Sequence, residues 1–347
     1  MSDVPQSARP RPTMRDVAAL SGVSLKTVSR VVNLEPGVSA DLVERVQTAA
    51  AALQYRPNLT ASSLRRSDGR TQTIGLVLEN IANPYSSALH RAIEDVARSH
   101  EVVVFAGSVD EDPARERELA GTFLARQVDG LIVVPAGADQ SYLAHELRAG
   151  TPMVFVDRPP NLLDADAVTT DNFAGARDAV RHLIAHGHRR IAYLGDLSSI
   201  FTAEQRLNGY LDALERAGIV LDADLIWQNL RSSDHAQTAI IELLTAAEPP
   251  TAVFASQNLV TIGAVRGIAA LGKQFEIALV GFDDIPLADL VSPRVSLVIQ
   301  DVHALGAAAA ELLFDRINGS DLPTQRITLP VHLVTAGSGE IAGPFAS

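Results

Sequence analysis

A short stretch of basic and polar side chains near the N-terminus has the chemistry needed to read the edges of DNA bases. Residues 14–33 predict two short helices joined at Gly22, whose backbone freedom suits a tight turn. In such a helix-turn-helix, the first residues of the second helix reach base edges in the major groove. At this place the sequence has four candidate side chains: Leu25, Lys26, Ser29 and Arg30. We expect Lys26 and Arg30 to donate hydrogen bonds to bases and Leu25 to make an apolar contact.

Contacts to DNA phosphates are expected from other side chains of the same helix. Hydroxyl groups and backbone N–H groups near a helix start bind the DNA backbone, which positions a protein without reading the sequence. The candidates for this role are Ser24, which also caps the helix, Thr27 and Ser29. Asn33 completes the DNA-facing set.

Three predicted helices must hold these side chains in place. Thr13, with Asp16 three residues later, forms a capping box for the first helix, and Ser39 caps a third. The apolar positions expected to form their shared core are Val17, Ala18, Leu20, Val28, Val31 or Val32, Leu42, Val46, Ala49 and Leu53. The pattern therefore predicts a helical unit over residues 13–57.

Beyond residue 72, short apolar runs alternate with helical stretches, a pattern typical of parallel sheets covered by helices. Runs rich in β-branched residues predict strands at 74–78, 102–105, 131–134, 153–156, 191–194, 252–255 and 277–280. Helices are expected near 86–99, 114–126, 140–149, 174–186, 203–217, 235–246 and 259–271. The two sets indicate two doubly wound lobes. Ligands bind such sheets at the carboxyl ends of the strands, so the cleft between the lobes is the expected ligand site.

The charge distribution separates a basic end from an acidic bulk. Residues 1–70 contain 10 Lys and Arg against 6 Asp and Glu, and the remaining residues contain 19 against 35. The basic end suits DNA phosphates, and the acidic bulk does not. The absence of cysteine excludes disulfides, thiolate metal sites and a cysteine nucleophile. The sequence contains no signal peptide pattern and no apolar run of membrane length, so we expect a cytoplasmic protein without membrane contact.

Together these landmarks resemble the lactose-repressor (LacI) family of bacterial transcription regulators, from about Thr13 to Gly337. In the N-terminal part the matching residues are 17–18, 21–24, 27–33, 38–39, 55–58, Ala61 and 63–65. Farther along they are 74–77, 83–85, 128–132, 156–158, 187–191, Arg206, 209–210, 281–284 and 305–306. So many landmarks in one order make the resemblance specific.

The resemblance implies an N-terminal all-α helix-turn-helix headpiece followed by an α/β two-lobed effector domain similar to periplasmic binding proteins, with two doubly wound parallel sheets. The expected segments are a disordered arm at 1–12, the headpiece at 13–57, a hinge helix and linker at 58–72, an N-lobe at 73–169 and 302–330, a C-lobe at 170–301 and 331–340, and a tail at 341–347. The chain would thus cross between the lobes three times.

The resemblance also implies site residues, carried over position by position. The effector-binding candidates are Glu79, Tyr85, Asp157, Phe173, Arg206, Gln257, Asp283 and Gln300. In the hinge, Asn58, Ala61 and Leu64 are expected at the DNA, with Leu64 entering a base step of the minor groove. The implied partners are pseudo-palindromic double-stranded operator DNA, a small-molecule effector and a second copy of the chain. The tail has no leucine heptads, so a homodimer is the expected assembly.

The function predicted in this way is that of a sequence-specific DNA-binding regulator, of the repressor type, controlled by a small molecule between the lobes. A sugar or sugar derivative is the favoured effector. A purine-dependent regulator stays open, although Tyr85 and Phe173 offer little surface for stacking. A solute-binding protein fits residues 73–340 equally well but leaves the headpiece unexplained. Whether the effector releases DNA or promotes its binding also stays open.

Two further patterns suggest other chemistry and have simpler explanations. Residues 267–274 have the spacing of a phosphate-binding loop, but they lie where a helix is expected to end. His182, His186 and His188 suggest a metal site, but Gly187 ends that helix, and histidines suit a helix C-terminus. No catalytic set or cofactor fingerprint is found, so we expect no enzyme activity, no cofactor and no metal.

Overall fold

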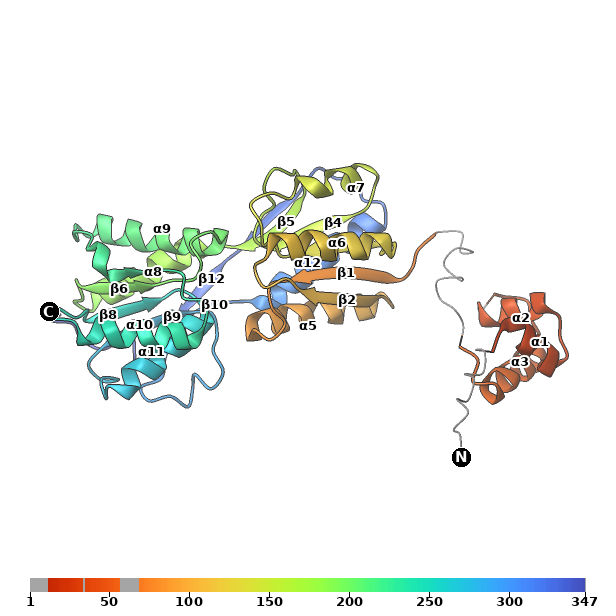
Figure 1. The fold of residues 1–347 in the computed structure, drawn as a ribbon, viewed down its shortest axis with the longest axis horizontal. Helices are drawn as coiled ribbons and strands as arrows, with labels where there is room; N and C mark the ends of the chain where they lie inside the picture. The colour runs from red at the N-terminus through yellow and green to blue at the C-terminus, as the bar shows by residue number, and fades with distance from the viewer. Residues whose placement is uncertain (1–11, 34, 57–68, 347) are drawn as a thin grey trace, which may run out of the picture. The chain divides into compact units, whose positions relative to one another are not determined.

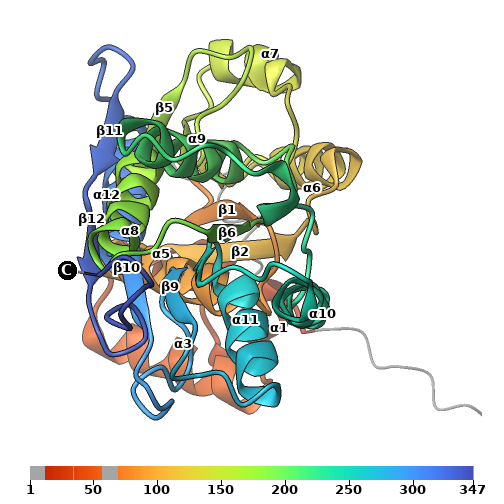
Figure 2. The same ribbon diagram turned by 90° about the vertical axis from the view of Figure 1, so that its left-hand side faces the viewer.

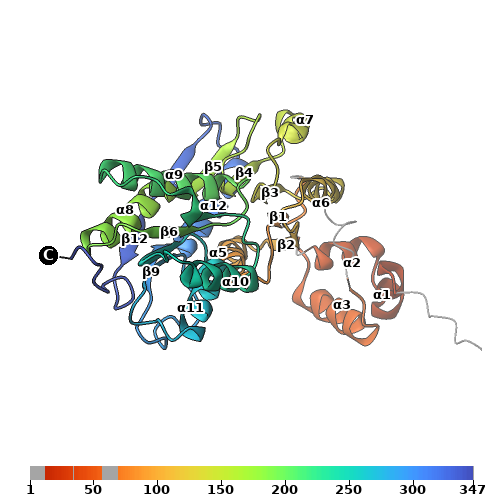
Figure 3. The ribbon, with the colours of Figure 1, turned by 60° about the vertical axis from the view of Figure 1, so that its left-hand side comes forward.

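The computed structural model describes residues 12–33, 35–56 and 69–346, which belong to two compact units (Figure 1); along the chain, the first ends at Thr71 and the second begins at Gln72. The helices of the first unit are α1 (Met14–Ser21), α2 (Leu25–Val32) and α3 (Ala40–Ala52), which pack together (Figure 3). The arm expected at residues 1–12 lies almost wholly outside the described residues. So do the hinge candidates Asn58, Ala61 and Leu64.

The predicted caps of the first two helices are confirmed. The backbone N–H and hydroxyl of Thr13 both donate to the carboxylate of Asp16, at 2.7 and 2.8 Å. Gly22 has a φ of 66°, which explains the glycine in the turn. The hydroxyl of Ser24 accepts a hydrogen bond from the N–H of Thr27 at 3.1 Å. Together these contacts fix where α1 ends and α2 begins.

The headpiece core contains one residue that the apolar pattern did not predict. Val17, Val28, Val31, Val46 and Ala49 are buried as expected. Leu20 is 56% exposed, so its placement in the core was wrong. The buried stripe of α1 runs through Ser21 instead, because its hydroxyl donates to the carbonyl of Val17 at 2.6 Å and needs no solvent.

The second unit contains two six-stranded sheets, and the first is the sheet of the N-lobe. Its order is β11 (Arg326–Leu329), β5 (Asp166–Thr170), β4 (Met153–Asp157), β3 (Gly130–Val133), β1 (Thr73–Leu78) and β2 (Val103–Ser108), all parallel. Helices α5 (Pro84–Ser99) and α12 (Val302–Ile317) cover one face. Helices α6 (Pro113–Ala125) and α7 (Ala144–Arg148), with a 3-10 turn at Ser141–Leu143, cover the other. Each face therefore has its own apolar core.

The sheet of the C-lobe has the same plan, with one antiparallel strand. Its order is β12 (Val331–Val334), β10 (Ser296–Gln300), β9 (Ala278–Phe282), β8 (Ala252–Ala255), β6 (Ile191–Leu194) and β7 (Ile226–Trp227), and β12 alone among these strands is antiparallel to its neighbour. Helices α8 (Asn172–Ala185) and α9 (Phe201–Arg216) cover one face, and α10 (Ser233–Thr245) and α11 (Asn258–Ala270) cover the other (Figure 2). A 3-10 turn at Ala223–Leu225 precedes β7.

The chain passes between the two sheets at three places. It leaves the N-lobe sheet after Thr170, returns after Gln300, and leaves again between Leu329 and Val331. At the first two crossings, the hydroxyl of Thr170 donates to the side-chain oxygen of Gln300. The carboxyl ends of the central strands of both sheets thus lie at the junction of the lobes.

The structure differs from the sequence pattern at several elements. Periodicity did not predict strands β5, β7, β10, β11 and β12 or helix α12. The strand expected at 102–105 runs from Val103 to Ser108. The helix expected at 140–149 is split into the 3-10 turn and α7. The tail folds back on the C-lobe, where the carbonyl of Ile341 lies 2.8 Å from Nε2 of His188. None of the helices described is long and apolar enough to cross a membrane.

Candidate functional site

Polar side chains from both lobes converge at the carboxyl ends of the strands. Glu79 directly follows β1, Asp157 ends β4, Ser256 follows β8 and Asp283 follows β9. They line one cavity together with residues from the first turns of α5, α9 and α11. The cavity has a volume of about 40 Å³. Pockets for small molecules are typically several hundred Å³, so the lobes must move apart to admit a ligand of that size.

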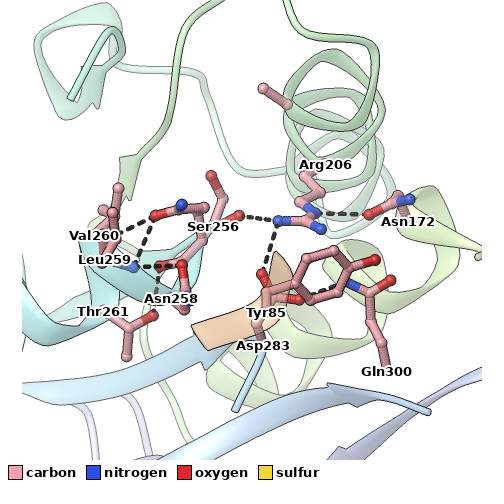
Figure 4. Close-up of polar contacts among 12 residues, drawn as sticks. Tyr85, Asn172, Arg206, Ser256, Asn258, Leu259, Val260, Thr261, Asp283 and Gln300 are labelled. Atoms are coloured by element: carbon pink, nitrogen blue, oxygen red, sulfur yellow. Dashed lines mark hydrogen bonds and ion pairs between the residues drawn. The ribbon is translucent and has the colours of Figure 1, made fainter. Parts of the chain in front are cut away.

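Arg206 on α9 is the centre of the polar network on the C-lobe side (Figure 4). Its Nε donates to Oδ1 of Asn172 at 2.7 Å, and its Nη1 donates to the carbonyl of Ser256 at 2.7 Å. Nη1 also lies 3.4 Å from the carboxylate of Asp283, and the guanidinium stacks 3.8 Å from the ring centre of Phe282. These contacts use Nε and Nη1, so Nη2 is the nitrogen that a ligand oxygen can approach.

Asp283 is held from two sides in the same network. The side-chain amide of Gln300 donates to its Oδ1, and Arg206 faces its Oδ2. Burial raises the pKa of Asp283, and the charge of Arg206 opposes this rise. Its φ of 68° lies in the left-handed region, which costs free energy for a residue other than glycine. The chain thus keeps a strained, buried carboxylate at the strand end, a feature typical of functional sites.

Asp157 has the corresponding position in the N-lobe. It also has a left-handed φ, of 70°, and its Oδ1 accepts a hydrogen bond from the hydroxyl of Tyr85 at 2.8 Å. Burial and the nearby carboxylate of Asp157 raise the pKa of Tyr85 far above its usual value, so this hydroxyl remains a donor. Asp157 and Asp283 therefore have matching, oriented positions at the cavity, one in each lobe.

A second group of charges lies beside these aspartates. Arg158 makes a two-pronged ion pair with Glu111, at 2.6 and 2.8 Å. The charges of Arg158 and Glu111 affect the pKa values of the nearby side chains Glu79 and Asp196. Burial raises the pKa of Glu79 to about 7, and the carboxylate of Glu111 adds to this rise. Glu79 thus changes its charge near neutral pH.

A hydrogen bond joins the two lobes at the cavity. Nδ2 of Asn258, the first residue of α11, donates to Oδ1 of Asn83 at 2.7 Å, and both residues are buried. Asn83 precedes α5 and caps it, because the same oxygen accepts from the N–H of Tyr85 at 3.1 Å. Nδ2 of Asn83 lies 3.4 Å from the carboxylate of Glu79. A ligand that separates the lobes must replace this bond.

The structure brings most of the predicted effector residues together and leaves one apart. Glu79, Tyr85, Asp157, Arg206, Gln257 and Asp283 line the cavity. Gln300 does not line the cavity, but its side-chain amide donates to Asp283, which does. Phe173 does not line this cavity and lies under the guanidinium of Arg177, at 5.9 Å, because its neighbour Asn172 points toward Arg206 in its place. The side chain of Gln257 caps α11 by accepting from two backbone N–H groups, which accounts for part of its role.

Several residues of the cavity were not predicted to be there. They are Asn83, Arg158, Asp196, Ser256 and Asn258, and Asn172 joins them through its hydrogen bond with Arg206. Asp196 and Asn258 follow β6 and β8, so a search of every strand end would have found them. Asn172 contacts Arg206, and Arg158 is paired with Glu111. No local sequence pattern indicates contacts between side chains so far apart in the chain.

The predicted DNA-facing side chains among residues 24–33 lie on α2 or at its ends, and several of them already have partners. Leu25 is 45% exposed and Lys26 is exposed, as a base-reading role requires. Nη2 of Arg30 donates to the carbonyl of Pro36 at 2.5 Å, and its Nε lies 3.5 Å from Glu35. Arg30 would have to exchange these contacts for bases. The hydroxyls of Ser24 and Thr27 are 2.9 Å apart, and the amide of Asn33 donates to Ser29 at 3.3 Å.

The two patterns that suggested other chemistry have structural roles. Residues 267–274 span the end of α11, where Gly272 has a φ of 68°, so they do not form a phosphate loop between a strand and a helix. Nδ1 of His188 lies 2.9 Å from the hydroxyl of Thr251, and Nδ1 of His186 lies 2.9 Å from the carbonyl of His182. In the part of the chain that the structure describes, no three side chains of metal-binding type gather at a metal site.

Comparison with known proteins gives matches for both units. Residues 13–58 match the family described as bacterial regulatory proteins, lacI family. Residues 180–338 match the family described as periplasmic binding protein-like domain. The first match includes all three helices of the headpiece, and the second includes Arg206 and Asp283.

The similar proteins extend over almost the whole chain. The HTH-type transcriptional regulator PtxS of Pseudomonas plecoglossicida is 34% identical, over 96% of this chain and 97% of its own. The ribose operon repressor of Halalkalibacterium halodurans is 34% identical, over 93% and 95%. Among solved structures, the lac repressor dimer bound to operator and the anti-inducer ONPF is 29% identical with a TM-score of 0.83, over 95% and 99%. The complex of the regulator CelR with cellobiose is 31% identical with a TM-score of 0.70, over 94% and 100%.

Proposed function

The chain belongs to the LacI family of bacterial regulatory proteins, and from this premise we propose that it is a transcriptional repressor controlled by a small molecule. The headpiece binds operator DNA, and the effector binds between the two lobes. The observation that carries the proposal is the buried network of Arg206, Asp283 and Asn172 at the strand ends, in a chain that also has an exposed recognition helix. A regulator of this kind acts at the chromosome, so we propose the bacterial cytoplasm as its location.

The DNA contacts follow from the exposed face of α2. Lys26 and Leu25 meet base edges in the major groove, with Arg30 joining them once it leaves the Pro36 carbonyl. Ser24, Thr27, Ser29 and Asn33 lie on the DNA side and contact phosphates. Asn58, Ala61 and Leu64 belong to the same proposal as minor-groove contacts, on the family resemblance alone.

The proposed effector is a sugar or sugar derivative. The CelR structure contains cellobiose, and a similar repressor is named for the ribose operon. The cavity suits such a ligand because Arg206 keeps Nη2 for a ring oxygen or hydroxyl, and the aspartates accept from hydroxyls. Glu79, Tyr85, Gln257 and Gln300 complete the contacts. Phe173 stays a weaker candidate, since it would reach the ligand only if the lobes rearranged.

A homodimer is the proposed assembly. The N-lobe sheet ends at β2, and this edge strand has Val103 58% exposed and Phe105 41% exposed. An apolar edge strand is stable in solution when another surface covers it. A twofold partner would place two headpieces on a pseudo-palindromic site.

The proposal is tested by selecting duplexes from a random DNA library with the purified chain. We expect enrichment of a twofold-symmetric site, and loss of its binding in Lys26→Ala. Lys273→Ala, in the effector domain, is the matched control and should bind the site normally. A chain that binds a sugar but selects no DNA sequence would instead be a solute-binding protein.

A further inference from the structure

The cavity contains more acidic than basic side chains. Of the described residues that line it, four are carboxylates (Glu79, Asp157, Asp196 and Asp283) and two are guanidiniums (Arg158 and Arg206). Glu79 and Asp157 come from the N-lobe, and Asp196 and Asp283 come from the C-lobe. A ligand between the lobes is therefore surrounded by carboxylates on both sides.

Both guanidiniums already have anionic partners. Both Nη atoms of Arg158 donate hydrogen bonds to the carboxylate of Glu111, at 2.6 and 2.8 Å. Its Nη1 also donates to the carbonyl of Pro135 at 2.8 Å. Arg206 faces Asp283 at 3.4 Å. Because these charges are matched inside the protein, little positive charge is left for an anionic ligand.

Glu79 and Asp196 are the carboxylates without a matching cation. Within the described residues neither forms an ion pair; Glu79 contacts the amide of Asn83 at 3.4 Å, and Asp196 accepts from the N–H of Leu197 at 2.7 Å. Burial raises the pKa of both side chains. Both side chains line the same cavity, so the two groups face the same space. Both keep oxygen atoms that can accept hydrogen bonds.

We propose, resting on the function proposed above, that Glu79 and Asp196 determine effector specificity by selecting a polyhydroxylated ligand that has no negative charge. Hydroxyl groups of the ligand donate to the two carboxylates, one from each lobe, and this holds the lobes together. A carboxylate or phosphate on the ligand meets like charge from both sides and is rejected. Specificity of this kind combines an attractive contact with a repulsive one.

The test is thermal unfolding of the full chain with matched sugars at pH 8, where the Glu79 side chain is mostly ionised. The uncharged probes are D-glucose, D-galactose, D-ribose and cellobiose, and the anionic probes are D-gluconate, D-galacturonate, D-glucose 6-phosphate and D-ribose 5-phosphate. We expect an uncharged probe to raise the Tm, by mass action, and its anionic counterpart to bind at least tenfold more weakly. In the double variant Glu79→Gln with Asp196→Asn, this preference should fall at least tenfold. Glu118→Gln, an exposed carboxylate on α6, is the control and should keep it.

Each contrary result has a distinct meaning. Stronger binding of a sugar acid or phosphate than of its uncharged parent overturns the inference. An unchanged preference in the double variant overturns the assignment to these two residues. A panel in which no probe raises the Tm overturns the polyhydroxylated ligand class. Operator binding, measured on the same preparation, decides separately whether the regulator function stands.

Discussion

Replacing Glu79 with glutamine should make the stability of the effector domain less sensitive to pH. Burial and the charge of Glu111 raise the pKa of Glu79 from 4.5 to about 7. The groups that face it are Glu111 and Arg158 in the N-lobe and Asp196 in the C-lobe. A raised pKa means that the folded chain holds the proton more tightly than the unfolded chain. The resulting stability is fully present below pH 4.5 and is lost as the pH rises through about 7.

The size of the effect follows from the shift. Each pKa unit corresponds to about 1.4 kcal/mol, so the complete shift is worth roughly 3 kcal/mol, of which about 2 kcal/mol falls between pH 5 and pH 8. Glu79 is only partly buried, and solvent screening reduces this figure. We therefore expect the wild-type chain to lose about 1 to 2 kcal/mol more than Glu79→Gln between these two pH values.

The assay is urea unfolding of both chains at pH 5 and pH 8, with Glu118→Gln as the control for a change in net charge. Comparing the chains removes the contribution of every other titrating group. The Glu118 variant should follow the wild type, because this side chain is exposed. Equal pH dependence in the wild type and Glu79→Gln would refute the reasoning that burial raises the pKa of Glu79 to about 7.

Three further predictions concern the network, the lobes and the edge strand. Arg206→Ala should lower the free energy of unfolding, measured in urea, by about 3 to 5 kcal/mol, because it leaves Asp283 as an unpaired buried charge. A decrease of less than about 1 kcal/mol would contradict this. Asn258→Asp places a carboxylate against the side-chain amide oxygen of Asn83 in the other lobe; it removes the bond that a ligand has to replace and should strengthen binding of a stabilising sugar about fivefold by calorimetry. Asn161→Asp, an exposed control, should leave the affinity unchanged; equal affinity in both variants would mean that the interlobe bond is dispensable. Phe105→Asp should shift sedimentation from dimer to monomer, since it places a charge on the proposed apolar edge; a dimer in this variant would place the interface elsewhere.

Much of the two-lobed plan was predictable because buried parallel strands are continuous apolar runs. The strands around Leu131 and Phe254 are of this kind. Strand β5, with the sequence Asp-Ala-Val-Thr-Thr, was not found, since its polar ends resemble a loop and only its neighbours β4 and β11 make it a strand. Leu20 shows the opposite error, because an apolar residue type does not fix which face of a short helix is buried.

The candidate site was predictable in its residue types and not in its contacts. Arg206 and Asp283 come from a resemblance to known relatives, and the rule that parallel strands end at one edge explains why they meet. The approach of Asp196 to Glu79 depends on how two separately folded lobes close, which no local pattern encodes. The same holds for the bond between Asn83 and Asn258.

The central claim is that ligand binding between the lobes changes operator binding, and it is tested by one titration. The operator selected from the random library is labelled, and its affinity for the chain is measured by fluorescence anisotropy without sugar and with a saturating, stabilising sugar. We expect a change of at least fivefold in Kd, in either direction, within the range typical of allosteric coupling. Identical Kd values in the two titrations would contradict it, because the cavity and the headpiece would then be independent.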